Sequence, residues 1–214
     1  MDRNVIENAI EYVKRVFEDD FSGHDFFHTL RVYKIASRIA DQEHADLLIV
    51  QLAALLHDVD DVKLSPSTHA NKYRAVNFLR EHGVAQDLID TICEIIDQVS
   101  FKGTDTVVPT TIEGKCVQDA DRLDAIGAVG IARTFAFGGN HRQPIYDPAV
   151  KPLLNASGEE YRNHASTTLN HFYEKLFLLK GMMNTATAKE MAKHRDEYMQ
   201  SFVAEFLKEW DGVL

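Results

Sequence analysis

The sequence predicts an all-α protein built as a single helical domain. Hydrophobic residues recur every three or four positions along most of the chain, which is the spacing of one face of an α-helix. No stretch alternates as a strand does, and neither a repeat nor a Pro/Ser-rich linker interrupts the 214 residues. With 45% hydrophobic and 26% charged residues, the chain can bury one sizeable core. We therefore expect one domain over residues 1–214.

Five helices are expected in the first half of the chain. The third is LLIVQLAALL at 47–56, which is apolar on nearly every side and should therefore lie at the centre of the protein. The fourth is expected from about Asn71 to His82, ended by Gly83. The first, second and fifth are marked by apolar stripes at helical spacing: Ile6, Ile10, Val13 and Phe17; Val32, Ile35, Ala36 and Ile39; Ile89, Ile92, Ile96 and Val99.

The second half continues the helical pattern. Thr110 to Glu113 match a capping box, which predicts the start of a sixth helix. We expect that helix to continue through DADRLDAIGAVGIARTF at 119–135. The segment 138–148 is expected to be a loop because it is rich in Gly and Pro. Two long helices at about 160–212 then close the chain.

Composition narrows the classes of function. The formal net charge of −10 disfavours binding to DNA or RNA polymers, because an acidic surface repels a phosphate backbone. No apolar run reaches the roughly 18 residues that cross a membrane, and the N-terminal segment has no signal-peptide pattern. Cys93 and Cys116 lie among apolar residues, as core cysteines do in a reducing compartment. We expect a cytoplasmic protein with neither a nucleic-acid polymer nor a membrane as partner.

Ionisable residues directly follow the most apolar helix. His57 and Asp58 come at the end of LLIVQLAALL, where burial is costly unless the groups are paired or coordinated. Either a shared divalent metal ion or a His–Asp salt bridge capping the helix would offset that cost. His28, at the start of another apolar stripe, is also expected to point towards the core. In DADRLDA, periodicity alone does not choose among three aspartates, Asp119, Asp121 and Asp124.

Three motifs in this order, HTLRV, LLHDVDD and ADRL, resemble the H…HD…D signature of the HD-domain superfamily of metal-dependent phosphohydrolases. The resemblance implies an HD-type helical bundle whose motif-bearing part spans about 20–135. It also implies one set of metal ligands: His28, His57, Asp58 and Asp121. Asp119 remains the alternative for the last ligand.

The mixed nitrogen and oxygen ligands suit one divalent ion, with Mn²⁺ as the leading choice and Fe²⁺, Co²⁺, Ni²⁺, Zn²⁺ or Mg²⁺ as alternatives. Resemblance to binuclear HD phosphodiesterases implies that a second metal would take further histidines from the interval that here contains His69 and His82. His69 lies in a polar segment and His82 at a helix end, so we expect one metal only.

Residues outside the predicted ligand set also have expected roles. By resemblance to the deoxynucleotidase branch, Asp61 is expected to assist proton transfer, although it could equally be a solvent-facing acid. Asp60 is expected to be such an acid. Lys63 could pair with a substrate phosphate, and so could His141 and Arg142 if their loop folds over the site.

The function expected from these features is metal-dependent hydrolysis of small phosphorylated compounds, nucleotides in particular. The run from GHDFFHTLRV to LNHFYEKL is similar to a branch of small bacterial HD proteins that includes a nucleoside triphosphate pyrophosphohydrolase. This similarity favours cleavage of nucleoside triphosphates to monophosphate and pyrophosphate. The alternatives are a 5′-nucleotidase or another phosphomonoesterase or phosphodiesterase, a non-catalytic nucleotide-binding HD module, and a binuclear HD oxygenase. Base preference and oligomeric state are not predicted.

Overall fold

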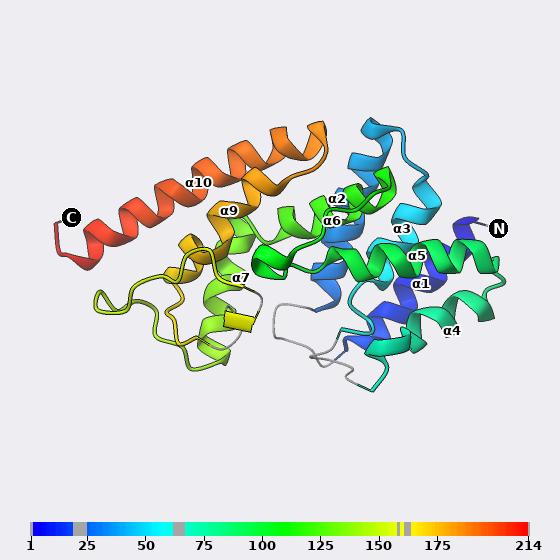
Figure 1. Cartoon of the computed structure of the whole chain (residues 1–214), viewed down its shortest axis with the longest axis horizontal. Helices are drawn as coiled ribbons and strands as arrows, with labels where there is room; N and C mark the ends of the chain where they lie inside the picture. The colour runs from blue at the N-terminus through cyan, green and yellow to red at the C-terminus, as the bar shows by residue number, and fades with distance from the viewer. Residues whose placement is uncertain (1, 19–24, 62–66, 158, 161–163, 214) are drawn as a thin grey trace. The chain divides into compact units, whose positions relative to one another are not determined.

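The computed structural model describes residues 2–18, 25–61, 67–157, 159–160 and 164–213. Within these ranges every regular element is a helix, and none is a strand, which confirms the all-α class (Figure 1). The chain divides into two compact units. The first unit comprises Met1–Ser100 and Val107–Asp121, and the second comprises Phe101–Thr106 and Arg122–Leu214. The domain boundaries expected from the sequence stay a prediction.

The first unit is built around one buried helix, as the sequence predicts. That helix, α3, packs against α1, α2 and α5, and α4 packs against α5. Five consecutive residues of α3, from Leu52 to Leu56, are completely buried, because no face of this helix is polar enough to meet solvent. The helices of this unit are α1 (Asp2–Val16), α2 (Phe26–Glu43), α3 (Leu47–Leu56), α4 (Tyr73–Glu81), α5 (Gln86–Val99) and most of α6 (Ile112–Asp124).

Short polar side chains fix where several of these helices begin. Asp25 precedes α2 and accepts a hydrogen bond from the backbone N–H of His28 at 2.7 Å. Asp46 precedes α3 and accepts from the backbone N–H groups of Leu48 and Ile49. Such caps satisfy N–H groups that have no partner inside the helix. Asp25 therefore fixes the start of the helix that contains the predicted ligand His28.

The predicted capping box of α6 is wrong by one residue. The helix begins at Ile112, and Thr111 rather than Thr110 accepts the hydrogen bond from Gly114 N, at 3.1 Å. Glu113 does not close the box, because its Oε1 accepts from the backbone N–H of Asp46 at 3.0 Å. Glu113 therefore makes a tertiary hydrogen bond instead of the local one that the capping box predicts.

The prediction of a single helix through residues 119–135 is also wrong, because α6 ends at Asp124. The next helix, α7 (Gly127–Asn140), begins with a glycine at φ +79°, and Ile126 before it is extended. A Cβ at Gly127 would lie 3.0 Å from Cγ of Arg195, so the stem of Arg195 occupies that space. The Arg195 guanidinium donates to the carbonyl of Leu123 in the last turn of α6. Glycine and a distant arginine together end one helix and start the next.

The second unit has an aromatic core. Its elements are η2 (Gly103–Asp105), α7, the π-helix η3 (Phe172–Leu176), α9 (Phe177–Leu179), η4 (Lys180–Met182) and the long α10 (Ala186–Trp210), drawn orange to red in Figure 1. Phe135 of α7 contacts Phe172, Phe202 and Phe206, and α10 packs against α7. Residues 138–140, expected in a loop, form the last turn of α7 instead.

The two cysteines are free thiols. Cys116 is fully buried in α6, and burial raises the pKa of its thiol to about 12. Cys93 in α5 is only partly buried, and burial raises the pKa of its thiol as well. Both thiols are therefore poor nucleophiles near neutral pH.

Candidate metal site

The end of α3 places two of the predicted ligands side by side. His57 is the C-terminal cap of α3, and Asp58 follows it in a turn. Nδ1 of His57 lies 2.8 Å from the carbonyl oxygen of Ala54, a distance at which the ring N–H donates to that oxygen. In the neutral imidazole this hydrogen bond leaves the lone pair on Nε2, which is the arrangement typical of metal-binding histidines. Both side chains are almost completely buried.

His28 reaches the same point from α2. It is completely buried, in the first turn of that helix. Its Nε2 lies 3.3 Å from Oδ2 of Asp58 and 3.5 Å from Oδ1 of Asp121. The His28 and His57 rings meet edge to face, with centroids 5.4 Å apart. The end of α3 and the start of α2 therefore present their imidazoles to the same pair of carboxylates.

Four donor atoms converge as a result. His57 Nε2 is 3.2 Å from Oδ2 of Asp58 and 3.9 Å from Oδ1 of Asp121. One ligand atom from each of His28, His57 and Asp58 lies within 4.8 Å of the others. Ligands about 2.1 Å from a shared ion are about 3.0 to 3.5 Å from each other. The side chains therefore fit one divalent ion, and their two nitrogens and two oxygens suit the transition metals named above.

The electrostatics of His57 reflect this crowding. Burial by itself lowers the pKa of the imidazole, because the charged form loses its hydration. The carboxylate of Asp58, by charge and by hydrogen bonding, and then that of Asp121 outweigh burial and raise the pKa to about 9. The cluster is thus a site where negative charge favours a bound cation.

The three aspartates of α6 have different surroundings. Asp119 is completely buried, and Asp124 is held by Arg133, whose Nη1 donates to Oδ2 of Asp124 at 2.8 Å. The side chain of Asp121 keeps 26% of its surface exposed and is the one that approaches the two histidines. The structure thus brings together the four residues predicted as ligands. Their role as ligands stays a prediction.

The acids after the HD doublet also differ from one another. Asp61 is half-buried, and its backbone N–H donates to the carbonyl of Asp58 at 3.0 Å. Asp60, which we expected to face solvent, is buried. Its carboxylate accepts hydrogen bonds from the backbone N–H groups of Arg74 and Ala75. Sequence reasoning missed this residue, because its partners lie 14 and 15 positions away. Lys63 falls outside the described residues.

Other histidines are engaged at helix ends. His82 ends α4, where its Nδ1 lies 2.8 Å from the carbonyl oxygen of Phe78 and its ring stacks on Phe78. His141 ends α7 in the same way, with Nδ1 2.9 Å from the oxygen of Phe137 and the ring stacked on Phe137. Both fit the capping role expected of a histidine near a helix C-terminus.

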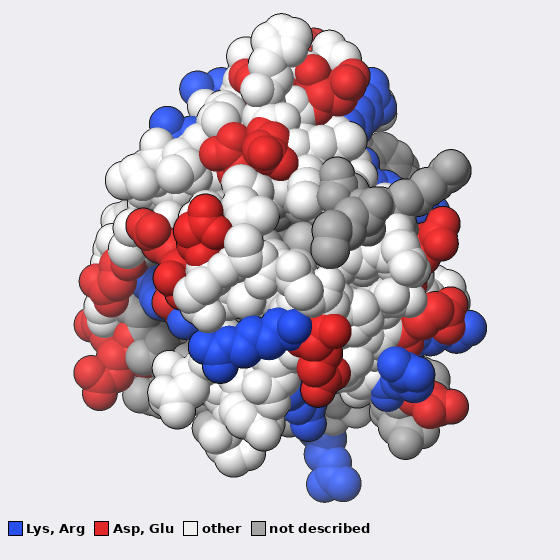
Figure 2. Space-filling model, turned by 90° about the vertical axis from the view of Figure 1, so that its right-hand side faces the viewer, with Lys and Arg blue, Asp and Glu red and all other residues white. Residues whose placement is uncertain are grey.

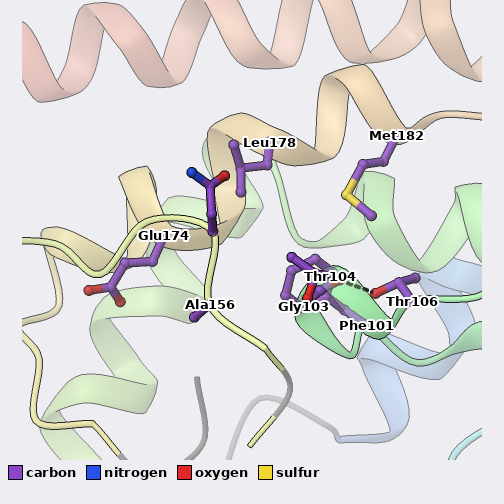
Figure 3. Close-up of a pocket in the computed structure, with 9 residues that line it drawn as sticks. Phe101, Gly103, Thr104, Thr106, Ala156, Glu174, Leu178 and Met182 are labelled. Atoms are coloured by element: carbon purple, nitrogen blue, oxygen red, sulfur yellow. Dashed lines mark hydrogen bonds between the residues drawn. The ribbon is translucent and has the colours of Figure 1, made fainter. Parts of the chain in front are cut away.

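A separate surface pocket of about 210 Å³ lies within the second unit (Figure 3). Leu178 and Met182 lie on the helical side of it, and Met182 points towards the turn that contains Thr104 and Thr106. Thr106 Oγ1 donates to the carbonyl of Gly103 at 2.8 Å. Phe101, Asn155, Ala156 and Glu174 complete the lining. None of these residues was predicted for the site.

Charged side chains of both signs are mixed on the face shown in Figure 2. There, Lys and Arg are scattered among Asp and Glu, with a broad uncharged area between them. In the part of the chain that the structure describes, no helix combines the length and the hydropathy needed to cross a bilayer.

Comparisons with known proteins place the chain in a family. The HD-domain model matches residues 25–126. The uncharacterized protein YpgQ of Bacillus subtilis is 41% identical over 209 residues, covering 97% of this chain and 94% of YpgQ. A crystal structure from Lactobacillus plantarum superposes with a TM-score of 0.87 at 41% identity and covers 97% of both chains.

Two further solved structures are similar to this chain over most of its length. An HD-superfamily hydrolase from Bacillus thuringiensis is 41% identical, with a TM-score of 0.77 and 99% of both chains covered. Bacillus subtilis YpgQ in complex with ADP is 38% identical, with a TM-score of 0.75, and the match covers 94% of this chain and 97% of that one. Matches of this length and identity show that the chain belongs to the HD-domain family.

Proposed function

We propose that this protein is a divalent-metal-dependent hydrolase of nucleotides, which cleaves nucleoside triphosphates to a monophosphate and pyrophosphate. The observation that supports metal-dependent chemistry most strongly is the convergence of two imidazole nitrogens and two carboxylate oxygens. These atoms lie 3.2 to 3.9 Å apart in four pairs, at the end of a buried helix. Membership of the HD-domain family supports the same chemistry.

His28, His57, Asp58 and Asp121 would hold the ion. A divalent ion bound there would polarise a phosphoryl oxygen and lower the pKa of a bound water. The protein's own part is to fix the two histidine tautomers. The hydrogen bond from His57 Nδ1–H to the carbonyl of Ala54 does this for one of the histidines.

Asp61 is proposed to move the proton. It follows Asp58 by three residues, in a turn closed by the bond from Asp61 N to Asp58 O. Its side chain is half-buried and therefore accessible to water. A carboxylate in that position could take a proton from the attacking water or deliver one to the leaving group. Lys63 is proposed to pair with a substrate phosphate.

A nucleotide is the proposed substrate class because a relative of 38% identity, YpgQ, has been crystallised with ADP. The net charge of −10 disfavours a nucleic-acid polymer but not a small nucleotide held by a metal. Cleavage between the α- and β-phosphates is favoured by the whole-chain similarity to the pyrophosphohydrolase branch.

The test is a product analysis. Purified protein would be incubated with Mn²⁺ and either nucleoside triphosphates such as dATP or nucleoside monophosphates, and the products separated by anion-exchange chromatography. We expect pyrophosphate and a monophosphate as the first products from triphosphates. His57→Ala protein purified in parallel is the control for a contaminating phosphatase. Orthophosphate from monophosphates, with triphosphates untouched, would establish a 5′-nucleotidase instead, and no product from either would favour a binding module.

A further inference from the structure

The turn between α3 and α4 contains a buried acid that the proposed chemistry does not use. Asp60 is only 4% exposed. Its Oδ1 accepts a hydrogen bond from the backbone N–H of Arg74 at 3.2 Å, and its Oδ2 accepts one from that of Ala75 at 2.9 Å. Both oxygens of one carboxylate are thus bound to the first turn of α4.

This helix has no cap of its own. The residue before α4, Lys72, has a left-handed backbone with φ 46° and makes no side-chain capping bond. Arg74 and Ala75 are the second and third residues of the helix, so their N–H groups have no partner within it. Asp60 supplies the missing acceptors from outside the helix, and its negative charge suits the positive end of the helix dipole.

A second bond ties the same two segments together. Nη1 of Arg74 donates to the carbonyl oxygen of Val59 at 3.4 Å. Val59 lies between Asp58 and Asp60, so two successive residues of the turn are bound to the start of α4. The first unit then holds α4 in place, because α4 packs on α5 and α5 packs on α3.

The turn needs such an anchor because α3 has already ended. Leu56 is the last helical residue, and residues 57–60 form a turn. Within it the backbone bonds run from Val59 N to Leu56 O at 3.3 Å and from Asp61 N to Asp58 O at 3.0 Å. The α-helix therefore ends before Asp58, and the bonds from Val59 and Asp60 to α4 hold the turn that contains it.

We propose that Asp60 is a positioning residue for the metal site: it fastens the turn that contains His57 and Asp58 to the start of α4 and so keeps both ligands in place. This inference rests on the proposed metal site. Residues that orient ligands without touching the metal typically contribute about 10- to 100-fold in affinity. An unfastened turn would let Asp58 sample other positions, and the metal would then have to order it on binding.

Asp46 offers a matched control. Like Asp60, it accepts hydrogen bonds from two backbone N–H groups in the first turn of a helix, those of Leu48 and Ile49 in α3. It lies at the opposite end of α3 from His57, about 15 Å away for a helix of this length. Asp46→Ala removes capping bonds of the same kind, at a cost of about 1 kcal/mol, without touching the ligand turn.

The experiment measures Mn²⁺ affinity by isothermal titration calorimetry, with no substrate present, alongside the free energy of unfolding by urea. We expect Asp60→Ala to weaken Mn²⁺ binding by about 10- to 100-fold. Asp60→Asn, which keeps one acceptor oxygen, should have a smaller effect. Asp46→Ala should lose stability but bind Mn²⁺ as the wild-type protein does. Arg74→Met, which removes the bond to Val59 but keeps the backbone N–H that binds Asp60, should weaken binding slightly.

Unchanged Mn²⁺ affinity in Asp60→Ala would overturn the inference, and so would an equal loss in Asp46→Ala, which would point to general loosening. If Asp60→Ala does not fold, Asp60→Asn and Arg74→Met decide: unchanged affinity in both contradicts the positioning role. A wild-type protein that binds neither Mn²⁺ nor any of the alternative divalent ions would overturn the proposed function itself. That result is distinct from a failure of the Asp60 inference alone.

Discussion

Each unit of the molecule places a histidine beside a buried carboxylate, but the surroundings differ. In the second unit, Oε1 of Glu174 accepts hydrogen bonds from Leu153 N at 3.0 Å and Ser166 Oγ at 2.7 Å, and lies 3.1 Å from His164 Nε2. In the first unit, His57 Nε2 faces two carboxylate oxygens at 3.2 and 3.9 Å. The Glu174 carboxylate is thus surrounded by hydrogen-bond donors. In the first unit, by contrast, two carboxylates converge on the imidazoles.

The difference separates a structural pair from a cation site. Neutral N–H and O–H donors satisfy the Glu174 carboxylate within the chain, so its burial requires nothing more. Two carboxylates at one point repel each other unless positive charge lies between them. A bound cation would therefore stabilise the cluster at the end of α3 by offsetting the repulsion between its carboxylates. The Glu174 group has no such second carboxylate.

The largest effect is expected from removing a ligand. Asp58→Ala should reduce phosphohydrolase turnover to the level of the buffer, because the ion would lose one of four donors and the turn would lose its charge. Helix content should stay near that of the wild-type protein, since Asp58 lies outside α3. Rates of product release and far-ultraviolet circular dichroism check this pair of outcomes. Wild-type turnover in the folded variant would mean that the cluster is not the active site.

Asp61→Asn should separate chemistry from metal binding. The amide cannot accept or deliver a proton, so we expect turnover to fall by about 10²- to 10⁴-fold. Metal content, measured by mass spectrometry of the dialysed protein, should remain that of the wild type. Unchanged kinetics would return Asp61 to the solvent-facing acid that the sequence also allowed. Loss of metal would make it a ligand rather than a proton donor.

The last ligand can be assigned by comparing two aspartates of the same helix. Asp121→Asn should weaken Mn²⁺ binding more than Asp119→Asn, because Asp121 Oδ1 is the oxygen that lies 3.5 Å from His28 and 3.9 Å from His57. Both variants should be titrated with Mn²⁺ under identical conditions. A greater loss in Asp119→Asn would move the ligand to that residue.

The smallest effect on activity is expected at the other histidine–carboxylate pair. Glu174→Ala leaves the N–H of Leu153 and the hydroxyl of Ser166 without their acceptor, which should cost about 1–3 kcal/mol of unfolding free energy. Turnover per folded molecule should not change. Urea unfolding and a rate corrected for the folded fraction check both parts. If turnover fell as it does in Asp58→Ala, the contrast between the two groups would break down.

The sequence predicted the elements that depend on local pattern. The all-α class, the burial of LLIVQLAALL and the end of α4 at Gly83 follow from periodicity and from glycine's backbone freedom, and all are observed. The grouping of His28, His57, Asp58 and Asp121 came from the resemblance, because spacing alone left three aspartates open.

What the sequence did not reveal depends on distant partners. Asp60 looks like one more acid in an acidic run, yet it caps a helix that begins 13 residues later. Gly127 ends a helical pattern because Arg195, far along the chain, fills the space beside it. The predicted capping box at Thr110 does not form, because Glu113 accepts a hydrogen bond from the backbone N–H of Asp46 instead. In each case a contact made only in the folded protein decided the outcome.

We propose that the cluster at the end of α3 binds one divalent ion and that the His164–Glu174 pair of the second unit does not. Equilibrium dialysis against Mn²⁺, followed by metal analysis, tests it most directly on the wild-type protein, His57→Ala and Glu174→Ala. We expect about one Mn²⁺ per chain in the wild type and in Glu174→Ala, and none in His57→Ala. Full occupancy in His57→Ala, or loss of the ion in a folded Glu174→Ala, would contradict it.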